Sequence, residues 1–193
     1  MEAAAARIVD AMRRSVAARG AAGSTFDQVA REAGVSRGLL HYYFGTKERL
    51  LAEVVRRDAA IRLEHLRSEL APAGTVEDVI DVLVHSLEDL VARDPGFVAL
   101  MFELFTSGRR NPEIAAEFAE LQRATRARLA ELLAAKQDEG VVRLAAEPEA
   151  VAAVLLSLAD GLALRLLGEP GHDHRAALSA GTVAARALLS TND

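Results

Sequence analysis

Apolar residues recur at helical spacing through most of the chain, and turn-forming residues interrupt the pattern. The stripe from Ile8 to Val16 repeats every three to four residues, which places its side chains on one face of an α-helix. Asp94-Pro95 and Asn111-Pro112 each combine a capping side chain with a proline suited to the first helical position. No segment shows the alternation typical of a strand. The pattern therefore predicts an all-α fold.

Caps and helix-breaking residues set the expected boundaries of nine helices. Ser24, with Asp27 three residues later, resembles a capping box at the start of the second helix. The first expected helix ends at Gly20, and the next four cover Ser24–Ala33, Ser36–Tyr43, Thr46–Leu70 and Thr75–Arg93. The sixth helix is expected to start at Pro95, and the seventh is expected to run from Pro112 to Gly140. The last two are expected to cover Pro148–Gly168 and Arg175–Leu189.

Composition agrees with helices and restricts the chemistry of the chain. Aromatic residues make up only 4%, there is no Trp, and Ala, Leu, Arg and Glu dominate. Because the chain has no Cys, disulfides, thiolate metal sites and Cys nucleophiles are excluded.

The net charge of −5 is distributed unevenly along the chain. Residues 1–57 contain ten Lys and Arg against six Asp and Glu, whereas the remaining residues are acidic overall. A basic first module suggests contact with a polyanion, although chance scatter of charges is an open alternative.

The longest segments without a charged residue are ten residues, 150–159 and 176–185. A membrane-spanning helix needs about 20 apolar residues, so we expect no transmembrane segment. The first residues lack the apolar core and cleavage site of a secretory signal. We therefore expect a cytoplasmic protein without a membrane partner.

Two short expected helices, Ser24–Ala33 and Ser36–Tyr43, are joined by a tight turn that contains Gly34. A glycine in such a turn can adopt the left-handed conformation that fixes the crossing angle of a helix-turn-helix. Val29, Val35, Leu40 and Tyr43 are expected on the inward faces. The second helix could then lie in the major groove of DNA, which is wide enough to admit one.

The segment Gly34–Leu51 resembles the DNA-binding signature of the TetR/AcrR family of transcriptional regulators. Gly34, Phe44, Lys47 and Leu50 stand at the family's spacing, and the resemblance covers roughly the first 55 residues. It implies an all-α homodimer that mostly represses transcription until a small molecule binds. We accordingly expect a three-helix helix-turn-helix domain in residues 1–50 and a helical effector-binding and dimerisation domain in residues 51–193.

Particular residues can be assigned to DNA contacts. Arg37 can bind guanine O6 and N7 with its planar fork, or it can be a solvated helix charge. Gly38 either lets the backbone approach DNA or is simply tolerated, and Lys47 stands beside a helix N-terminus suited to phosphate. The family most often has Tyr where His41 stands and often His where Tyr43 stands, but an imidazole can still donate one hydrogen bond. The expected DNA-binding residues, some of which double as caps, are Ser24, Thr25, Ser36, Arg37, Gly38, Leu39, His41, Tyr42, Tyr43, Thr46 and Lys47.

The last two helices carry more apolar residues than one core face needs, so we expect them to form the dimer interface, with a monomeric core as the alternative. The resemblance implies a four-helix bundle there, and a pseudo-palindromic double-stranded operator as partner. The expected interface residues are Val151, Val154, Leu155, Leu158, Leu162, Leu166, Gly181 and Leu188. An apolar or amphipathic effector is expected among the middle helices. Its candidate contacts, each singly more typical of core or surface, are His85, Phe97, Met101, Phe102, Phe105, Phe118, Gln122, Ser157 and Asp160.

Other functions remain as alternatives. A DNA-binding activator or an effector-independent regulator would show the same first 55 residues, and a helical protein-interaction module is a further possibility. A small helical enzyme is less favoured because the chain has no G-x-S-x-G, Walker A or H-E-x-x-H pattern. His172-Asp173-His174 lacks a third ligand at clear spacing, so we expect no metal and no cofactor.

Overall fold

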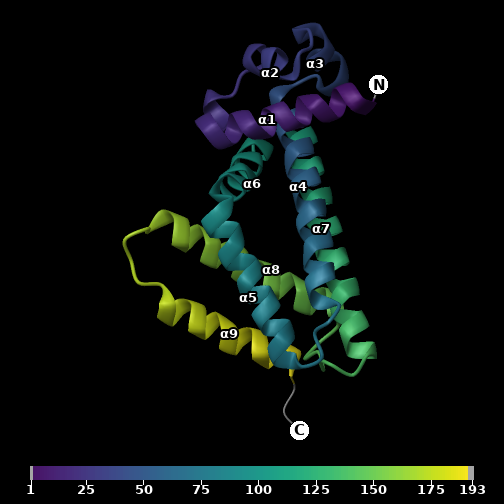
Figure 1. Ribbon diagram of the computed structural model, residues 1–193, viewed down its shortest axis with the longest axis vertical. Helices are drawn as coiled ribbons and strands as arrows, with labels where there is room; N and C mark the ends of the chain where they lie inside the picture. Colours follow the sequence, from purple (N-terminus) through teal and green to yellow (C-terminus); the bar gives the residue numbers. More distant parts are fainter. Residues whose placement is uncertain (1, 191–193) are drawn as a thin grey trace. The chain divides into compact units, whose positions relative to one another are not determined.

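The computed structural model describes residues 2–190, and within them it contains nine α-helices and no strand. This confirms the predicted all-α class. Figure 1 traces the helices along the chain. Their bounds are α1 (Glu2–Gly23), α2 (Phe26–Ala33), α3 (Arg37–Phe44), α4 (Lys47–Leu70), α5 (Val76–Arg93), α6 (Pro95–Gly108), α7 (Pro112–Asp138), α8 (Pro148–Gly168) and α9 (Arg175–Leu189).

The chain forms two compact units. The first unit comprises residues up to 59 together with 99–121, and the second comprises residues 60–98 and those from 122 onwards. The three boundaries between them fall inside α4, α6 and α7, so each of these helices contributes to both units. The units describe packing, whereas the division into residues 1–50 and 51–193 concerns function and remains a prediction.

The first unit buries apolar side chains from each of the first four helices. Ile8 of α1, Val29 of α2, Leu40 of α3 and Leu50 of α4 are all fully inaccessible to solvent. Two ion pairs also join α1 to α4, Arg13 with Asp58 at 2.8 Å and Arg57 with Asp10 at 2.7 Å. The first half of α4 is therefore fixed to α1 by both apolar and charged contacts.

The second unit has its own apolar core, built from α4, α5, α7, α8 and α9. Leu70, Ile80, Leu133, Val151 and Leu189 lie at its centre. The start of α5 follows the sequence expectation, because the Thr75 hydroxyl accepts a hydrogen bond from the Asp78 N–H while the Asp78 carboxylate accepts from the Thr75 N–H.

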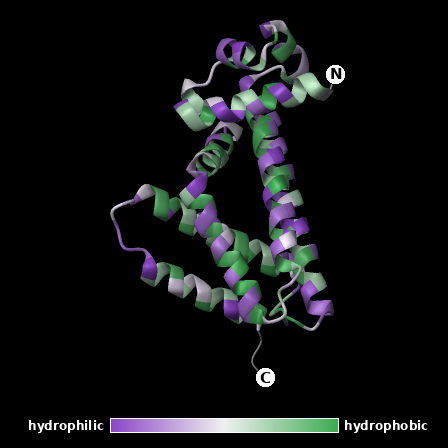
Figure 2. Cartoon of the chain, in the orientation of Figure 1, coloured by the Kyte–Doolittle hydropathy of each residue, from purple (hydrophilic) through white to green (hydrophobic). Residues whose placement is uncertain are grey.

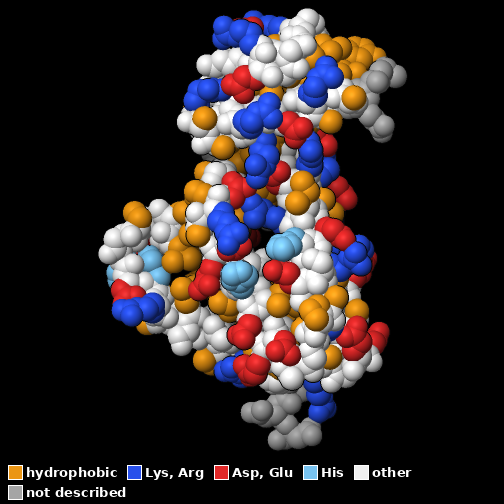
Figure 3. Space-filling model, viewed as in Figure 1, with side chains coloured by type: hydrophobic (Ala, Val, Ile, Leu, Met, Phe, Trp, Pro, Cys, Tyr) orange, Lys and Arg blue, Asp and Glu red, His pale blue; other side chains and the backbone are white. Residues whose placement is uncertain are grey.

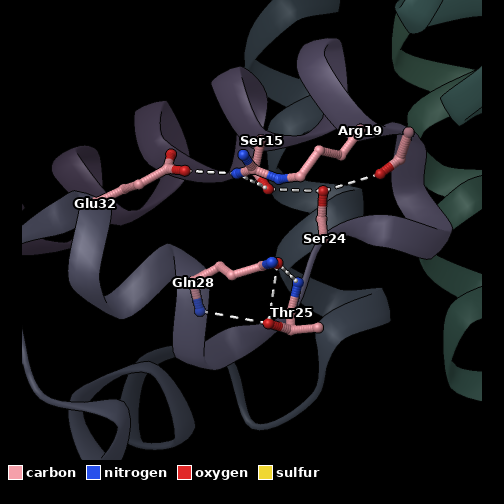
Figure 4. A network of polar contacts seen from close by, with 7 residues as sticks. Ser15, Arg19, Ser24, Thr25, Gln28 and Glu32 are labelled. Carbon is pink, nitrogen blue, oxygen red and sulfur yellow. Dashed lines mark hydrogen bonds and ion pairs between the residues drawn. The ribbon is translucent and has the colours of Figure 1, made fainter.

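Two expected helix ends are wrong by a few residues. Gly20, with φ of 72° and ψ of 169°, kinks α1 rather than ending it, and helical backbone continues to Gly23. The cap of α2 is Thr25 with Gln28, not Ser24 with Asp27 (Figure 4). The Ser24 hydroxyl instead donates to the Gly20 carbonyl at 2.9 Å and accepts from Ser15 at 2.8 Å, so it is occupied inside the unit.

Helix α8 is predominantly hydrophobic (Figure 2). Among the described residues it alone is long and apolar enough, by length and composition, to cross a membrane, a candidate that the length of the uncharged segments did not predict. A core helix of a globular protein can have the same composition, but only 22% of the most apolar part of α8 is buried within the chain. The helix therefore leaves apolar surface uncovered in a single copy.

Candidate DNA-binding surface

The turn between α2 and α3 is specified by local hydrogen bonds. Gly34 adopts the left-handed conformation, with φ of 65° and ψ of 40°, and its N–H donates to the carbonyls of Ala30 and Arg31 in the last turn of α2. Ser36 then caps α3, since its hydroxyl accepts from the Leu39 N–H at 3.3 Å. An added Cβ at Gly34 would meet no atom within 4 Å, so the backbone angle, and not lack of space, favours glycine.

Helix α3 has a buried side and an exposed side. The Leu40 side chain is fully buried, and Tyr43 of the same helix is half-buried. Arg37, Gly38, His41 and Tyr42 are exposed, and their spacing of one and four residues places them on one face of the helix. We call these four residues the α3 face. Tyr42 is 74% exposed, whereas aromatic side chains in folded proteins are usually at least partly buried. This exposure suits contact with a partner.

Arg37 has a partner that the sequence analysis missed. Its Nη1 atom donates to both carboxylate oxygens of Asp27 on α2, at 3.2 and 3.3 Å. Both side chains are about three-fifths exposed, at 59% and 61%. The two residues are ten positions apart and on different helices, so only the crossing of α2 and α3 brings them together.

Packing within the chain does not require glycine at position 38. A Cβ added to Gly38 would meet only the Ser36 hydroxyl oxygen, at 3.9 Å, which is an ordinary contact. Gly38 is the second residue of α3, so the cost of about 1 kcal/mol that glycine imposes on a helix interior is an upper limit here, and no close approach inside the protein offsets it.

His41 is oriented by two contacts. Its Nδ1 atom lies 3.0 Å from the Gly45 carbonyl oxygen, and its ring meets that of Phe26 edge-on at a centroid distance of 4.9 Å. Since a carbonyl can only accept, Nδ1 carries the proton in this arrangement and Nε2 of the neutral ring is an acceptor. With Nδ1 directed to Gly45, a hydrogen bond from His41 to phosphate would have to come from Nε2, which donates only in the imidazolium form.

The remaining candidates differ in accessibility. Thr46 caps α4 by accepting from the Arg49 N–H at 3.2 Å, and Lys47 is the first residue of that helix. Thr25, Ser36 and Thr46 are exposed, and Leu39, Tyr43 and Lys47 are half-buried. Ser24 is fully buried and hydrogen-bonded within the first unit, so its side chain does not belong to the surface. Figure 3 shows Lys and Arg side chains at the surface over α2 and α3.

The candidate effector residues divide between the two units. In the first unit the rings of Phe105 and Phe118 lie 6.1 Å apart, and Met101 and Phe102 stand on the same helix as Phe105. The others belong to the second unit, which comprises His85, Phe97, Gln122, Ser157 and Asp160.

Several of these second-unit side chains already have partners. Arg62 lies over the Phe97 ring at 4.8 Å, His85 is 3.9 Å from Asp89, and the Ser157 hydroxyl donates to the Ala153 carbonyl at 2.8 Å. Partial desolvation raises the pKa of the Asp160 carboxyl above its usual value, although part of the residue remains accessible to solvent.

The candidate dimer residues also separate. Val151 and Leu155 are buried in the core of the second unit, so for these two the alternative of a core role applies. Leu158, Leu162, Leu166 and Leu188 are half-buried, and Val154 is exposed. Gly181 serves packing inside the chain, because a Cβ there would lie 3.0 Å from Leu162 of α8. Two exposed apolar residues, Leu164 on α8 and Val183 on α9, were missed by the sequence analysis.

The His172-Asp173-His174 segment holds together by itself. The two imidazole rings meet at a centroid distance of 4.9 Å, and Asp173 pairs with Arg175 at 2.7 Å. Hydrogen bonds from Arg175 lower the pKa of the Asp173 carboxyl. Within the described part of the chain, no three His, Asp or Glu residues are grouped so that they could hold a metal ion.

Two family profiles match the sequence. Residues 8–54 match the profile of bacterial regulatory proteins of the tetR family, and residues 76–190 match the carboxyl-terminal profile of BetI-type transcriptional repressors. The regulator BetI of Agrobacterium fabrum is 32% identical over 109 residues, which are 55% of this chain and 52% of that protein. The repressor AcnR of Corynebacterium efficiens is 27% identical over 82% of this chain and 79% of its own. The first of these alignments thus spans about half the length of the relative.

Solved structures share the fold over nearly the whole chain. A TetR transcription regulator from Haloarcula marismortui has a TM-score of 0.73 and 22% identity, covering 98% of this chain and all of its own. FadR of Bacillus subtilis, in complex with stearoyl-CoA, has a TM-score of 0.71 and 18% identity over 93% and 96%. A Saccharomonospora viridis protein in complex with choline has a TM-score of 0.70 and 20% identity over 98% and 100%.

The relatives are transcriptional regulators rather than enzymes. The BetI-type profile alone covers more than half of the 193 residues, and the tetR profile covers both α2 and α3. The chain belongs to the TetR family of bacterial transcriptional regulators, with a carboxyl-terminal region of the BetI type.

Proposed function

We propose that this protein is a sequence-specific DNA-binding regulator of transcription, in which α3 enters the major groove of an operator. The observation that carries the proposal is the α3 face, where Arg37, Gly38, His41 and Tyr42 are exposed while the opposite side of the helix is anchored by buried Leu40. A helix held in this way can present side chains to base edges without losing its packing.

The side chains suggest different roles on DNA. Arg37 is suited to guanine, because its fork can donate to O6 and N7 together. Lys47, with the N–H groups at the start of α4, is suited to phosphate, as are the exposed capping residues Thr25, Ser36 and Thr46. Neutral His41 exposes an acceptor at Nε2, which suits a base amino group better than a phosphate oxygen.

The protein is proposed to act as a homodimer. One helix in one half-site gives weak binding, whereas a two-fold dimer presents two copies of α3 about 34–36 Å apart on a pseudo-palindromic operator. Partly uncovered apolar residues on the last two helices support this assembly, since Val154 and Leu164 on α8 and Val183 on α9 expose apolar surface that a second copy would bury. Residues 1–50 would then bind DNA, and residues 51–193 would bind the effector and the second copy.

The proposed activity is repression that ends when a small apolar or amphipathic molecule binds, in a cytoplasmic protein without catalysis, cofactor or membrane partner. The BetI-type match and the stearoyl-CoA and choline complexes of fold relatives support a ligand-responsive repressor. Both ligands have apolar surface and a charged group, in keeping with an amphipathic effector. An activator, or a regulator without effector, is the alternative.

Selection of genomic fragments by the purified full-length protein tests the proposal. The expected result is a shared pseudo-palindrome near a promoter, whose half-site spacing reports the dimer. A protein that is monomeric in solution and retains no duplex in preference to competitor DNA at moderate salt would refute it. Repression and activation are then distinguished by transcription from the recovered promoter in vitro, with and without protein.

A further inference from the structure

Asp27 places a negative charge on the surface that we propose meets DNA. The residue stands in the first turn of α2 and is 61% exposed, so it is not held there by core packing. A carboxylate close to the phosphates weakens binding to any duplex, because the attraction of DNA-binding proteins comes largely from neutralising phosphate charge. Its position beside Arg37 suggests what it contributes in return.

The contact uses only part of the Arg37 guanidinium. Both carboxylate oxygens of Asp27 accept from the same nitrogen, Nη1. Within residues 2–190 the structure describes no hydrogen bond from Nε or Nη2 of Arg37, so this edge is free to bind a ligand. The Nε and Nη2 donors are parallel and match the two acceptors of guanine in the major groove. Asp27 can therefore hold one side of the guanidinium while the other side contacts a base.

We propose that Asp27 determines specificity through Arg37, orienting its guanidinium toward one base pair and keeping it from binding phosphate wherever that base pair is absent. An unrestrained arginine on a flexible stem binds phosphate on any sequence, which raises affinity without discrimination. A carboxylate that competes for the guanidinium makes the contact depend on an acceptor pair of the right geometry. The inference rests on the proposed DNA-binding function.

The test measures discrimination, defined as the dissociation constant for an operator with one substituted base pair divided by that for the selected operator. Asp27→Asn keeps the size of the side chain and removes its charge. We expect tighter binding to random duplex and a discrimination at one base pair that is about two- to fivefold lower, the range that corresponds to an exposed ion pair. Discrimination at the other positions should not change.

The same substitution in an Arg37→Ala background shows whether Asp27 acts through Arg37. The expected result is no further loss of discrimination there, since the two residues form one unit. If Asp27 itself accepted a hydrogen bond from a cytosine amino group, Asp27→Asn would lower discrimination equally in both backgrounds, and the proposal would be wrong.

Glu48→Gln is the matched control, because Glu48 is also an acidic residue in the first turn of a helix of the first unit. It should strengthen binding to all duplexes alike. An equal fall in discrimination with this control would assign the effect to charge in general and overturn the proposal.

Thermal unfolding verifies that the Asp27→Asn protein is folded. Asp27→Ser, which keeps a polar residue at the helix start, is a second variant with the same expectation. If the wild-type protein selects a duplex and neither variant changes its discrimination, only this inference fails. If the wild type selects none, the proposed function fails with it.

Discussion

Lys136 of α7 is a buried cation whose removal should destabilise the second unit. Its side chain is 5% exposed, and Nζ donates to the carbonyls of Ala71 at 3.2 Å and Ala73 at 3.0 Å and to the Glu139 carboxylate at 2.7 Å. An ammonium group has three donors, so all of them are used. The carbonyls follow the end of α4, where backbone acceptors lack helical partners and a cation is favoured by the helix dipole.

The magnitude follows from what Lys136→Met would leave behind. The Ala73 carbonyl belongs to a buried residue and would lose its donor, at a cost of about 1–3 kcal/mol. Ala71 is exposed and the Glu139 side chain is 55% exposed, so water can replace the ammonium there. Removing a charge from the interior also avoids its desolvation penalty, which offsets part of the loss. The balance predicts a net destabilisation of about 1–2 kcal/mol.

Urea unfolding followed by circular dichroism measures this difference. Protein concentration must be held fixed, since dimerisation would couple to unfolding. The midpoint should fall with little change in slope, because the folded core stays the same size. Glu139→Gln is the control and should cost less than about 1 kcal/mol, since that carboxylate is largely exposed. A Lys136→Met protein as stable as the wild type, or more stable, would refute the reasoning and show that desolvation of the ammonium outweighs its hydrogen bonds.

Three further predictions concern single side chains. Thr25→Ala should lower the free energy of unfolding by about 1 kcal/mol through loss of the α2 cap, and a neutral result in urea would contradict the cap assignment. Hydrogen bonds from Thr75 and from the Gly74 N–H lower the pKa of the Asp78 carboxyl below 3.8, so its contribution to stability is present above that pH and is lost as the pH falls through the lowered value. Acid titration of unfolding should therefore show a shallower loss of stability for Asp78→Asn than for the wild type. Arg37→Ala should relax base preference at one position, whereas Lys47→Ala should weaken binding to all duplexes and reduce the salt slope by about one, and identical effects in binding titrations would contradict their separate roles.

Helix starts could be predicted wherever local capping chemistry decides them. Thr75 with Asp78 is such a case, because both partners lie within four residues and need no tertiary contact. At Ser24 and Thr25 two hydroxyl residues compete for one cap, and the capping box itself favours Thr25, because Gln28 is of the Glu or Gln type that the box prefers and Asp27 is not. The structure adds a second reason in Ser15, which lies nine residues earlier and donates a hydrogen bond to the Ser24 hydroxyl in the interior of the first unit. A tertiary contact of this kind is invisible to a capping rule.

The candidate DNA-binding surface was predictable to the same extent. The spacing of the α3 residues and the turn at Gly34 follow from the sequence, and the structure places four of them together on the exposed α3 face. The partner of Arg37 and the orientation of His41 could not be predicted, since Asp27 and Gly45 are brought close only by helix crossing and by the backbone beyond α3. Both contacts change what the side chains can donate, so the chemistry of the surface depends on them more than on residue type.

The dimer candidates show a different limit, which arises from the composition of α8. A helix with one apolar stripe reveals its buried side through periodicity, but a helix that is apolar on most sides does not. The sequence could therefore recognise an excess of apolar residues without dividing Val151 and Leu155, which fill the core, from Val154 and Leu164, which remain exposed. That division makes the dimer proposal specific, because polar substitutions at the exposed pair should affect association, whereas the same changes at the buried pair should unfold the second unit.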